Sequence, residues 1–390
     1  MKKYGLIGKK LDYSYSKIIH DFLINKYNID ASYELIETDY LNKNMLLDYD
    51  GLNITIPYKN EVISLLDRHN SNLGCNTVSN DNGFLEGCNT DIYGFEYLVE
   101  QLNIDKIETV IILGSGASAN MVQEYFKGKE IIVISRSDVY YNYQNIDKFK
   151  ADLLVNTTPI GMNNFDSPVD DVSNYKSVID LNYNPINSKL KMQCLKAKIP
   201  FVNGINMLII QAIKSFEIWH GIKVDEVVIK EILIEMLILL NNKIALVGMP
   251  LSGKTTLANK YNGIDLDEYI IRNEDTTIED LLINNSFRKK ETYYLKELIS
   301  NNINLIACGG GIVEDSYNIE LLKDYLIIYL EVPLEVLKKR LKSDTRPLLK
   351  SIDDLIETYK RRESIYINSS NIILNEKEIE LLLDKYSKKI

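Results

Sequence analysis

Few residues in this sequence could build a disulfide framework or a metal site based on histidine and cysteine. The chain has 390 residues but only four cysteines and three histidines. No two cysteines stand in a C-x-x-C pair, and His20, His69 and His220 lie far apart along the chain. Because disulfide scaffolds and zinc sites depend on closely spaced ligands, we expect neither of them here.

Long apolar runs are also missing. A membrane-spanning helix needs ~18 or more consecutive apolar residues, and the most apolar segment, residues 229–240, is interrupted by Lys230, Glu231 and Glu235. The first residues lack the long apolar stretch of a secretory signal. We therefore expect a cytoplasmic protein without a membrane partner.

The chain lacks a basic excess as well. It has 45 Lys and Arg residues against 55 Asp and Glu residues, so its formal net charge is -10. Proteins that bind nucleic acid are usually basic or carry a basic stripe, and we therefore expect no nucleic-acid partner. If the substrates are anions, cations must be concentrated locally at the site.

The composition that remains is that of a globular protein, with 45% hydrophobic and 26% charged residues. The length suggests two or three domains. Short β-branched runs alternate with helical patterns, which predicts an α/β architecture with parallel sheets. The expected strands cover residues 3–7, 109–113, 131–135, 153–156, 177–181, 243–247, 305–307 and 326–330.

Two of these strands lead directly into glycine-rich turns. The strand over 109–113 precedes Gly114-Ser115-Gly116, and the strand over 243–247 precedes Gly248. A strand, a glycine turn and a helix in succession open a nucleotide-binding fold, so the sequence predicts two such units. We expect the boundary near Asn241-Asn242, after a helix over residues 225–240.

The most specific motif is a phosphate-binding loop. Residues 248–255, Gly-Met-Pro-Leu-Ser-Gly-Lys-Thr, match G-x-x-x-x-G-K-[ST] after a strand and before a helix. The loop N–H groups would surround phosphate oxygens, Lys254 would reach the β- and γ-phosphates, and Thr255 would hold Mg²⁺. We assign ATP binding to the residues Gly248, Ser252, Gly253, Lys254, Thr255 and Thr256.

Carboxylates, glycines and arginines follow this loop in a fixed order. Asp265 and Asp267 take alternate positions of an expected strand, so one could support Mg²⁺ while the other faces an acceptor hydroxyl. The later residues are Arg288, the triple glycine 309–311, Arg346 before Pro-Leu-Leu, and Arg362. In this order, the chain from about residue 242 to its end resembles a shikimate kinase.

The resemblance to shikimate kinases implies a role for each matched residue. It implies that Asp267 contacts the shikimate hydroxyls as the catalytic carboxylate and that Asp265 supports Mg²⁺. It implies that the substrate is bound by Arg288, Arg362, Gly310 and Gly311, and that Arg346 is a lid arginine at the ATP site. Guanidinium groups suit a carboxylate ligand because they bind it bidentately. The segment between the loop and Asp265 is shorter than in the family, which predicts a truncated first helix.

The other glycine turn is a partial dinucleotide fingerprint. Gly114, Gly116 and Ala117 follow a strand and open a helix whose N-terminus would bind a pyrophosphate. The next strand ends at Ser135-Arg136, and Arg136 stands 22 residues after Gly114. An acidic residue there would bind the ribose of NAD, whereas Arg136 favours the 2′-phosphate of NADP.

Polar residues are scattered through the first 100 residues. Ser14 and Ser16 follow the first strand, residues 53–59 form an expected alternating strand that ends in Lys59, and Asp91 comes later. A lysine and an aspartate brought together in a cleft can share a proton and perform acid/base chemistry at neutral pH. Read alone, Lys59 is better explained as a solvated strand end, and Asp91 as a helix cap.

Taken together, residues 1–240 resemble a shikimate dehydrogenase. The matching motifs are the paired serines, Ile-Pro-Tyr-Lys at 56–59, Asn-Thr-Asp at 89–91, Asn-Thr-Thr-Pro at 156–159 and Tyr-Asn-Pro at 183–185. The resemblance implies substrate binding by Ser14, Ser16, Thr55, Asn76, Tyr183 and Gln211, and places Thr157 and Met207 at the cofactor. The family usually has Gly at Ala117 and Arg at Asn120, so one phosphate-binding cation is missing.

The two resemblances imply a bifunctional enzyme of the shikimate pathway. Residues 1–240 would reduce 3-dehydroshikimate with NADPH, through a substrate part over 1–100 and 205–240 and a Rossmann-like NADP part over 101–204. Residues 242–390 would form a P-loop kinase domain with a parallel sheet that phosphorylates shikimate with ATP and Mg²⁺.

Two alternatives stay open. One half could be catalytically inactive and serve as a binding or regulatory module, or the first half could be a quinate-type dehydrogenase that prefers NAD. The sequence leaves the oligomeric state open.

Overall fold

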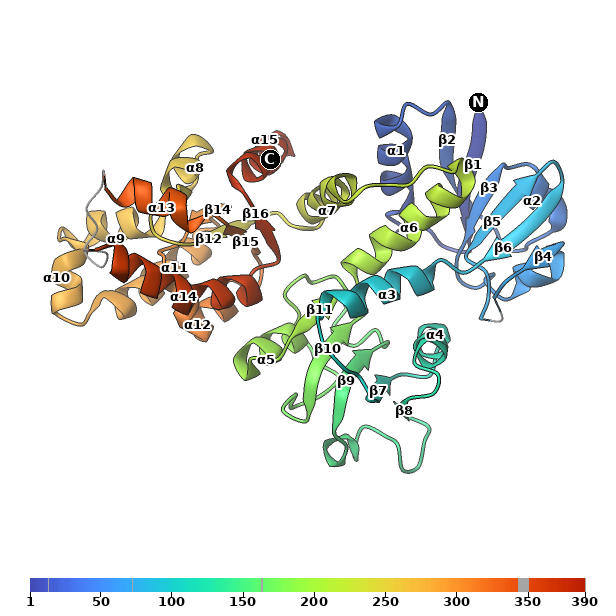
Figure 1. Cartoon of the computed structure of the whole chain (residues 1–390), viewed down its shortest axis with the longest axis horizontal. Helices are drawn as coiled ribbons and strands as arrows, with labels where there is room; N and C mark the ends of the chain where they lie inside the picture. The colour runs from blue at the N-terminus through green and yellow to red at the C-terminus, as the bar shows by residue number, and fades with distance from the viewer. Residues whose placement is uncertain (13, 72, 163, 343–350, 390) are drawn as a thin grey trace. The chain divides into compact units, whose positions relative to one another are not determined.

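The structure is a computed structural model that describes residues 1–390 except 13, 72, 163, 343–350 and 390. Strands and helices alternate along the chain, as the α/β prediction requires (Figure 1). The contacts divide the chain into two compact units. Unit 1 comprises residues 1–160, 168–183 and 199–233, and unit 2 comprises residues 161–167, 184–198 and 234–390.

Among the described residues, no helix is both long enough and apolar enough to cross a bilayer.

Unit 1 begins with a six-stranded mixed sheet in the order β2-β1-β3-β5-β6-β4. Its strands are β1 (Lys2–Gly8), β2 (Ala31–Glu37), β3 (Gly51–Ile54), β4 (Arg68–His69), β5 (Thr77–Asp81) and β6 (Phe84–Cys88). β3 is parallel to β1 and antiparallel to β5. Its residues are buried, and Ile7, Leu52, Ile54, Val62 and Val78 belong to the core packed on this sheet. The ends of β1 and β3 therefore bring the segments after them to one edge of the sheet.

The second sheet of unit 1 is entirely parallel, in the order β11-β10-β9-β7-β8. Its strands are β7 (Thr109–Leu113), β8 (Glu130–Ile134), β9 (Ala151–Asn156), β10 (Tyr175–Asp180) and β11 (Phe201–Asn203). A parallel sheet is covered on both faces, which explains its continuous apolar strands. β7 lies between β8 and β9, so the order of the strands reverses there, and ligands of such sheets bind at the carboxyl ends beside this point.

Unit 2 contains a third sheet, also parallel, in the order β13-β14-β12-β15-β16. Its strands are β12 (Ile244–Val247), β13 (Ile264–Asp265), β14 (Leu305–Ala307), β15 (Leu326–Leu330) and β16 (Ile372–Leu374). The central strand β12 is flanked by β14 and β15, and it is the strand that leads into the phosphate-binding loop. This loop, the triple glycine after β14 and the end of β13 therefore meet at one edge of the sheet.

Helices connect the strands of each sheet. The helices of unit 1 are α1 (Ser16–Lys26), α2 (Lys43–Leu47), α3 (Asp91–Gln101), α4 (Ala117–Tyr125) and α6 (Ile205–His220). α7 (Glu226–Leu240) runs from unit 1 into unit 2. Unit 2 holds α5 (Lys189–Ala197), α8 (Lys254–Lys260), α9 (Leu266–Glu274), α10 (Ile278–Ile283), α11 (Phe287–Ser300), α12 (Ser316–Leu321), α13 (Leu334–Leu341), α14 (Ile352–Ser369) and α15 (Glu376–Lys389). Short 3₁₀ turns are η1 (Glu61–Leu65), η2 (Ile146–Lys148) and η3 (Ile312–Glu314).

Helices α3 and α6 lie side by side and join the two sheets of unit 1 (Figure 1). α3 carries Asp91 at its first position, and α6 carries Met207 and Gln211. Gly94 on α3 makes this close approach possible, because a Cβ atom there would lie 2.6 Å from the Met207 carbonyl oxygen. The packing of the two helices thus fixes the position of Asp91 relative to Met207 and Gln211.

The predicted strands agree with the observed ones to within one or two residues at either end. Two predictions of local structure are wrong. β3 ends at Ile54, and residues 55–59 form turns rather than a continuation of the strand. β13 ends at Asp265, and Asp267 lies in the first turn of α9. In the second case the Asp265 Oδ1 atom accepts the Glu268 N–H at 3.0 Å, so this carboxylate caps a helix where we expected an extended strand.

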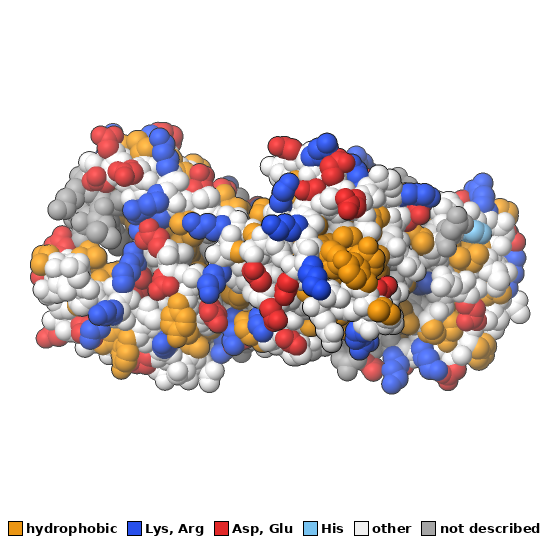
Figure 2. All heavy atoms as spheres, turned by 90° about the horizontal axis from the view of Figure 1, so that it is seen from below, with side chains coloured by type: hydrophobic (Ala, Val, Ile, Leu, Met, Phe, Trp, Pro, Cys, Tyr) orange, Lys and Arg blue, Asp and Glu red, His pale blue; other side chains and the backbone are white. Residues whose placement is uncertain are grey.

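Charged side chains of both signs are visible on one face of the molecule (Figure 2). On the face drawn in Figure 2, the described Lys and Arg side chains are interspersed with Asp and Glu side chains and do not gather into one basic surface.

Candidate active sites

The centre of the first candidate site is an ion pair in unit 1. The Lys59 Nζ atom lies 2.6 Å from the Asp91 Oδ2 atom, and the two side chains are 26% and 21% exposed. Asn76 donates from Nδ2 to the other carboxylate oxygen of Asp91 at 2.9 Å. Both oxygens of Asp91 are therefore held, and the lysine ammonium group sits at a fixed position that water and a substrate can still reach.

A buried polar network extends from this pair into the core of unit 1. The Asn76 Oδ1 atom accepts the Thr90 backbone N–H at 2.7 Å. The Thr77 and Ser215 hydroxyl oxygens lie 2.7 Å apart, and Asn53 donates to the Ser215 Oγ atom at 2.9 Å. The network fixes Asn76, and through it Asp91, because each buried polar group is satisfied by a neighbour.

The sequence analysis missed Thr77 and Ser215 in this network. Ser215 stands four residues after Gln211 on α6, which places both on the same helix face. This four-residue spacing is the feature of the sequence that could have linked Ser215 to the predicted site.

The remaining predicted substrate residues of unit 1 lie near the ends of strands and helices, except Gln211, which lies in the middle of α6. Ser16 is the first residue of α1, and its backbone N–H donates to the Ser14 Oγ atom at 3.3 Å. Thr55 directly follows β3. The Tyr183 ring packs edge-on against Tyr15 at 6.2 Å between centroids, and burial raises the pKa of Tyr183. Gln211 donates to the Leu208 carbonyl oxygen at 2.8 Å, not to the ion pair.

The predicted NADP loop has the backbone that a dinucleotide phosphate needs. Gly114 adopts φ +106°, and a Cβ atom there would lie 2.7 Å from the Thr157 Oγ1 atom. Thr157 in turn donates to the Leu113 carbonyl oxygen at 2.6 Å. α4 begins at Ala117 with Gly116 as its cap and no side-chain cap, so N–H groups of its first turn are available to an anion. These observations fit a bound pyrophosphate.

Arg136 lies two residues beyond the end of β8 and is exposed. The neighbouring Ser135 backbone N–H donates to the Tyr141 carbonyl oxygen at 3.0 Å, which fixes the turn that carries the guanidinium group. A cation at this place can meet a 2′-phosphate on the adenosine ribose of NADP.

The second candidate site is a cavity of about 860 Å³ in unit 2. It is lined by the phosphate-binding loop, the end of β13, the triple glycine and two arginines from α11 and α14. Nine predicted residues that line it are Ser252, Gly253, Lys254, Thr255, Thr256, Asp265, Asp267, Arg288 and Arg362. Gly310 and Gly311 line it as well. Arg346 lies outside the described residues.

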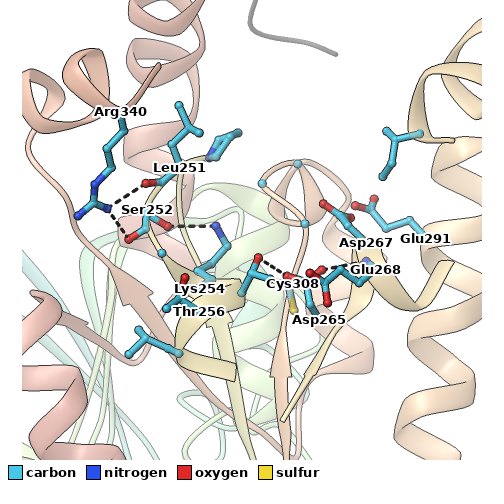
Figure 3. A pocket seen from close by; sticks show the side chains of 18 of the residues that line it. Leu251, Ser252, Lys254, Thr256, Asp265, Asp267, Glu268, Glu291, Cys308 and Arg340 are labelled. Atoms are coloured by element: carbon cyan, nitrogen blue, oxygen red, sulfur yellow. Dashed lines mark hydrogen bonds between the residues drawn. The ribbon is translucent and has the colours of Figure 1, made fainter. Parts of the chain in front are cut away.

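The loop is shaped for phosphate and its polar groups are held by neighbours (Figure 3). The Lys254 Nζ atom donates to the Gly248 carbonyl oxygen at 2.9 Å and to the Ser252 Oγ atom at 3.1 Å. Gly248 and Gly253 have φ values of +149° and +102°, which favour glycine. The Thr255 hydroxyl donates to the Asp265 Oδ2 atom at 2.6 Å. A hydroxyl and a carboxylate oxygen in contact are the hard ligands that Mg²⁺ prefers.

Each glycine of the triple glycine makes room for a neighbouring group. A Cβ atom on Gly309 would lie 2.6 Å from Asp267 Oδ1 and 2.9 Å from Glu291 Oε1, and one on Gly311 would lie 2.0 Å from Arg288. Figure 3 shows the carboxylates of Asp267 and Glu291 close together. Any side chain at these positions would push the carboxylates and the guanidinium group out of the cavity.

Glu291 and Arg340 also line this cavity, and Glu314 contacts two of the arginines that line it; the sequence patterns indicated none of these three residues. Glu291 is fully buried and lies 2.7 Å from Arg288, and burial raises its pKa. Glu314 contacts both Arg288 and Arg362. Arg340 donates to the carbonyl oxygens of Leu251 and Ser252 at 3.0 and 3.1 Å. Glu291 stands three residues after Arg288 on α11, and this helical spacing could have indicated the pair.

Comparison with known proteins adds independent findings. The family model described as shikimate kinase matches residues 250–388, and the one described as shikimate dehydrogenase substrate binding domain matches residues 6–78. The shikimate dehydrogenase (NADP(+)) of Clostridium beijerinckii is 34% identical over 254 residues, which are 58% of this chain and 94% of that protein. The enzyme of that name from Clostridium perfringens strain 13 is 32% identical over 60% of this chain and 98% of its own length.

A solved structure matches the same part of the chain. The chorismate mutase/shikimate 5-dehydrogenase fusion protein from Clostridium acetobutylicum is 32% identical, with a TM-score of 0.57. The match covers 60% of this chain and 97% of that one.

Proposed function

Since the chain belongs to the shikimate dehydrogenase family and carries a shikimate kinase domain after that part, we propose that it is a bifunctional enzyme of the shikimate pathway. The first activity reduces 3-dehydroshikimate to shikimate with NADPH, and the second phosphorylates shikimate with ATP. The hydroxyl formed in the first reaction is the one phosphorylated in the second. Because the product of the first reaction is the substrate of the second, the two assignments support each other.

The dehydrogenase assignment depends above all on the 2.6 Å ion pair of Lys59 and Asp91. Bound NADPH supplies the hydride. The Lys59 ammonium group donates a proton to the substrate oxygen that becomes the hydroxyl, and Asp91 orients the ammonium group and stabilises its charge. Ser14, Ser16, Thr55, Asn76, Tyr183 and Gln211 bind the substrate, and Gly114, Gly116, Ala117, Ser135, Arg136, Thr157 and Met207 form the cofactor site.

The kinase assignment depends on the convergence of Lys254, Asp267, Arg288 and Arg362 on one cavity. Bound MgATP supplies the phosphoryl group. The loop N–H groups and Lys254 bind its phosphates, and Thr255 with Asp265 would hold Mg²⁺. Asp267 accepts the proton of the attacking hydroxyl, while Arg288 and Arg362 bind the substrate carboxylate. Positioning and charge stabilisation supply most of the catalysis in such phosphoryl transfers.

We propose the domain bounds 1–240 and 242–390. The substrate part comprises 1–100 and 205–240, and the NADP part comprises 101–204. The end of α7 at Leu240 and the start of β12 at Ile244 support this division.

We also propose that the enzyme acts in the cytoplasm on small molecules, without nucleic-acid or membrane partners.

A second candidate is that only one half is catalytically active. α8 has seven residues, which is short for the helix that follows a phosphate-binding loop. Asn120 also brings no cation to the NADP loop, and its side chain accepts a hydrogen bond from Gln123 at 3.4 Å. Either departure could weaken one site.

The test is a coupled assay of the purified full chain with 3-dehydroshikimate, NADPH and MgATP. We expect equal amounts of NADP⁺ and ADP, with shikimate 3-phosphate as the product. Without MgATP, the reaction should stop at shikimate. Without NADPH, added shikimate should still be phosphorylated. Loss of either reaction in a folded protein would leave the second candidate.

A further inference from the structure

Glu314 contacts the two arginines that are proposed to bind a substrate carboxylate. It ends the 3₁₀ turn η3, directly after the triple glycine. Its Oε2 atom lies 2.9 Å from the Arg362 Nη2 atom and 3.1 Å from the Arg288 Nη2 atom. Its Oε1 atom lies 3.2 Å from the Arg361 Nη2 atom. One side-chain carboxylate thus bridges the guanidinium groups of α11 and α14.

The Arg362 guanidinium group is only half satisfied by this contact. Its side chain is 5% exposed, and its buried Nε atom has no hydrogen-bond partner among the described residues. The N–H groups on Nε and on Nη2 form a planar fork that fits both oxygens of one carboxylate. Glu314 takes the Nη2 side of this fork alone. A buried donor without a partner is costly, so the fork favours a ligand that engages both nitrogens.

The two glutamates at this cluster differ in how firmly they are held. Glu291 is fully buried and binds the Arg288 Nη1 atom. The Glu314 side chain is 29% exposed and adjoins Arg361, which is 59% exposed. Burial acts to raise the pKa of Glu314, but the arginines, Arg362 foremost, outweigh it and lower the pKa. Glu314 is therefore an anion at neutral pH with a route toward solvent.

The three arginines of this cluster contact two glutamates. Arg288 contacts Glu291 and Glu314, and Arg361 and Arg362 contact Glu314. A substrate carboxylate that binds Arg288 and Arg362 must therefore compete with Glu314 for their Nη2 atoms.

We propose that Glu314 is an internal competitor of the substrate carboxylate in the kinase cavity, an inference that rests on the proposed kinase function. Glu314 holds Arg288 and Arg362 in position while the cavity is empty. A substrate carboxylate displaces it from both Nη2 atoms, takes the fork of Arg362, and leaves Glu314 paired with Arg361. Glu314 therefore raises the KM for shikimate above the value that the arginines alone would give.

The test is to measure kcat and KM for shikimate in the full-length Glu314→Gln and Glu314→Ala proteins at saturating MgATP. Partly exposed ion pairs are worth up to about 1 kcal/mol each, so we expect KM to fall on the order of three- to tenfold, with a smaller change in kcat. Glu320→Gln, an exposed glutamate of α12, is the matched control and should leave KM unchanged. A thermal melt of the same samples verifies folding.

The possible outcomes separate this inference from the proposed function. If the wild-type protein phosphorylates shikimate and both variants show an unchanged KM, Glu314 does not compete. If both variants show a higher KM, Glu314 orders the arginines for the substrate, and the inference is again wrong. A wild-type protein that does not phosphorylate shikimate would overturn the proposed function and this inference with it.

Discussion

The two candidate sites differ in what their charged side chains contact. In unit 1 the ammonium and carboxylate groups that we propose to be catalytic contact each other, Lys59 to Asp91 at 2.6 Å. In unit 2 two groups that would bind ligand contact a local substitute for it. Lys254 binds loop carbonyl oxygens, and Arg362 binds Glu314. The dehydrogenase site is thus assembled for its chemistry, whereas the kinase site must exchange internal partners for ligands. The two reactions should respond separately to substitutions.

Lys59→Ala should have the largest effect. It removes the proposed proton donor, and general acid/base groups contribute ~10²–10⁴-fold. We expect reduction of 3-dehydroshikimate to fall by that factor, while phosphorylation of added shikimate stays near normal. Both rates should be measured on the same protein, with a thermal melt to verify folding. A folded variant that also loses kinase turnover would contradict two independent sites.

Asp267→Asn should produce the reverse pattern. The amide keeps the shape of the side chain but cannot accept the proton of the substrate hydroxyl. We therefore expect the kinase rate to fall ~10²–10⁴-fold with normal reduction of 3-dehydroshikimate. Glu320→Gln, the exposed glutamate of α12, is the control. A near-normal kinase rate for Asp267→Asn would remove Asp267 from the proton-transfer role.

Lys254→Ala should reduce phosphoryl transfer on the order of 10³-fold, because the lysine stabilises charge on the transferred group. NADPH oxidation should stay close to normal. Lys260→Ala, at the far end of α8 and paired with Glu380, controls for a general loss of positive charge. A Lys254→Ala protein that phosphorylates shikimate normally would show that this loop does not bind the transferred phosphate.

Arg136→Ala tests cofactor choice within unit 1. Hydrogen bonds to a charged group are worth about 1.5–3 kcal/mol, so the KM for NADPH should rise about ten- to a hundredfold. The KM for NADH, which has no 2′-phosphate, should change little. Arg68→Ala, an exposed arginine paired with Glu86, is the control. Equal effects on both cofactors would remove Arg136 from the site and favour a quinate-type enzyme that prefers NAD.

Ser215→Ala should have the smallest effect, and on stability. Its hydroxyl is fully buried and contacts Asn53, Thr77 and Thr90. Its loss should lower the free energy of unfolding by about 1–3 kcal/mol. The Ser215 hydroxyl also donates to the carbonyl oxygen of Gln211, four positions earlier, at 3.0 Å. Ser300→Ala is the matched control, because its hydroxyl donates to the carbonyl oxygen four positions earlier as well but is exposed. This control should cost under about 0.5 kcal/mol. An equal loss of unfolding free energy in both variants would show that the buried network stabilises the protein no more than an exposed hydrogen bond does.

Short-range patterns predicted much of the fold. The strands 109–113, 305–307 and 326–330 occur at the predicted residues, because short, largely apolar runs are typical of strands in a buried parallel sheet. The phosphate-binding loop was also predictable, since its function depends on contiguous residues. Prediction was wrong at residues 55–59 and at Asp267, where competing local bonds ended a strand early.

The sequence by itself determined the two nucleotide-binding units, the phosphate-binding loop and the identity of the charged residues. Only the tertiary structure decided their partners. Lys59 meets Asp91 across 32 residues, Asn53 meets Ser215 across 162, and Glu314 reaches Arg362 across 48. Periodicity reports which face of one element is buried. It carries no information on which two elements meet, because that depends on the packing of whole sheets and helices. The competition at Glu314 is therefore visible only where η3, α11 and α14 converge.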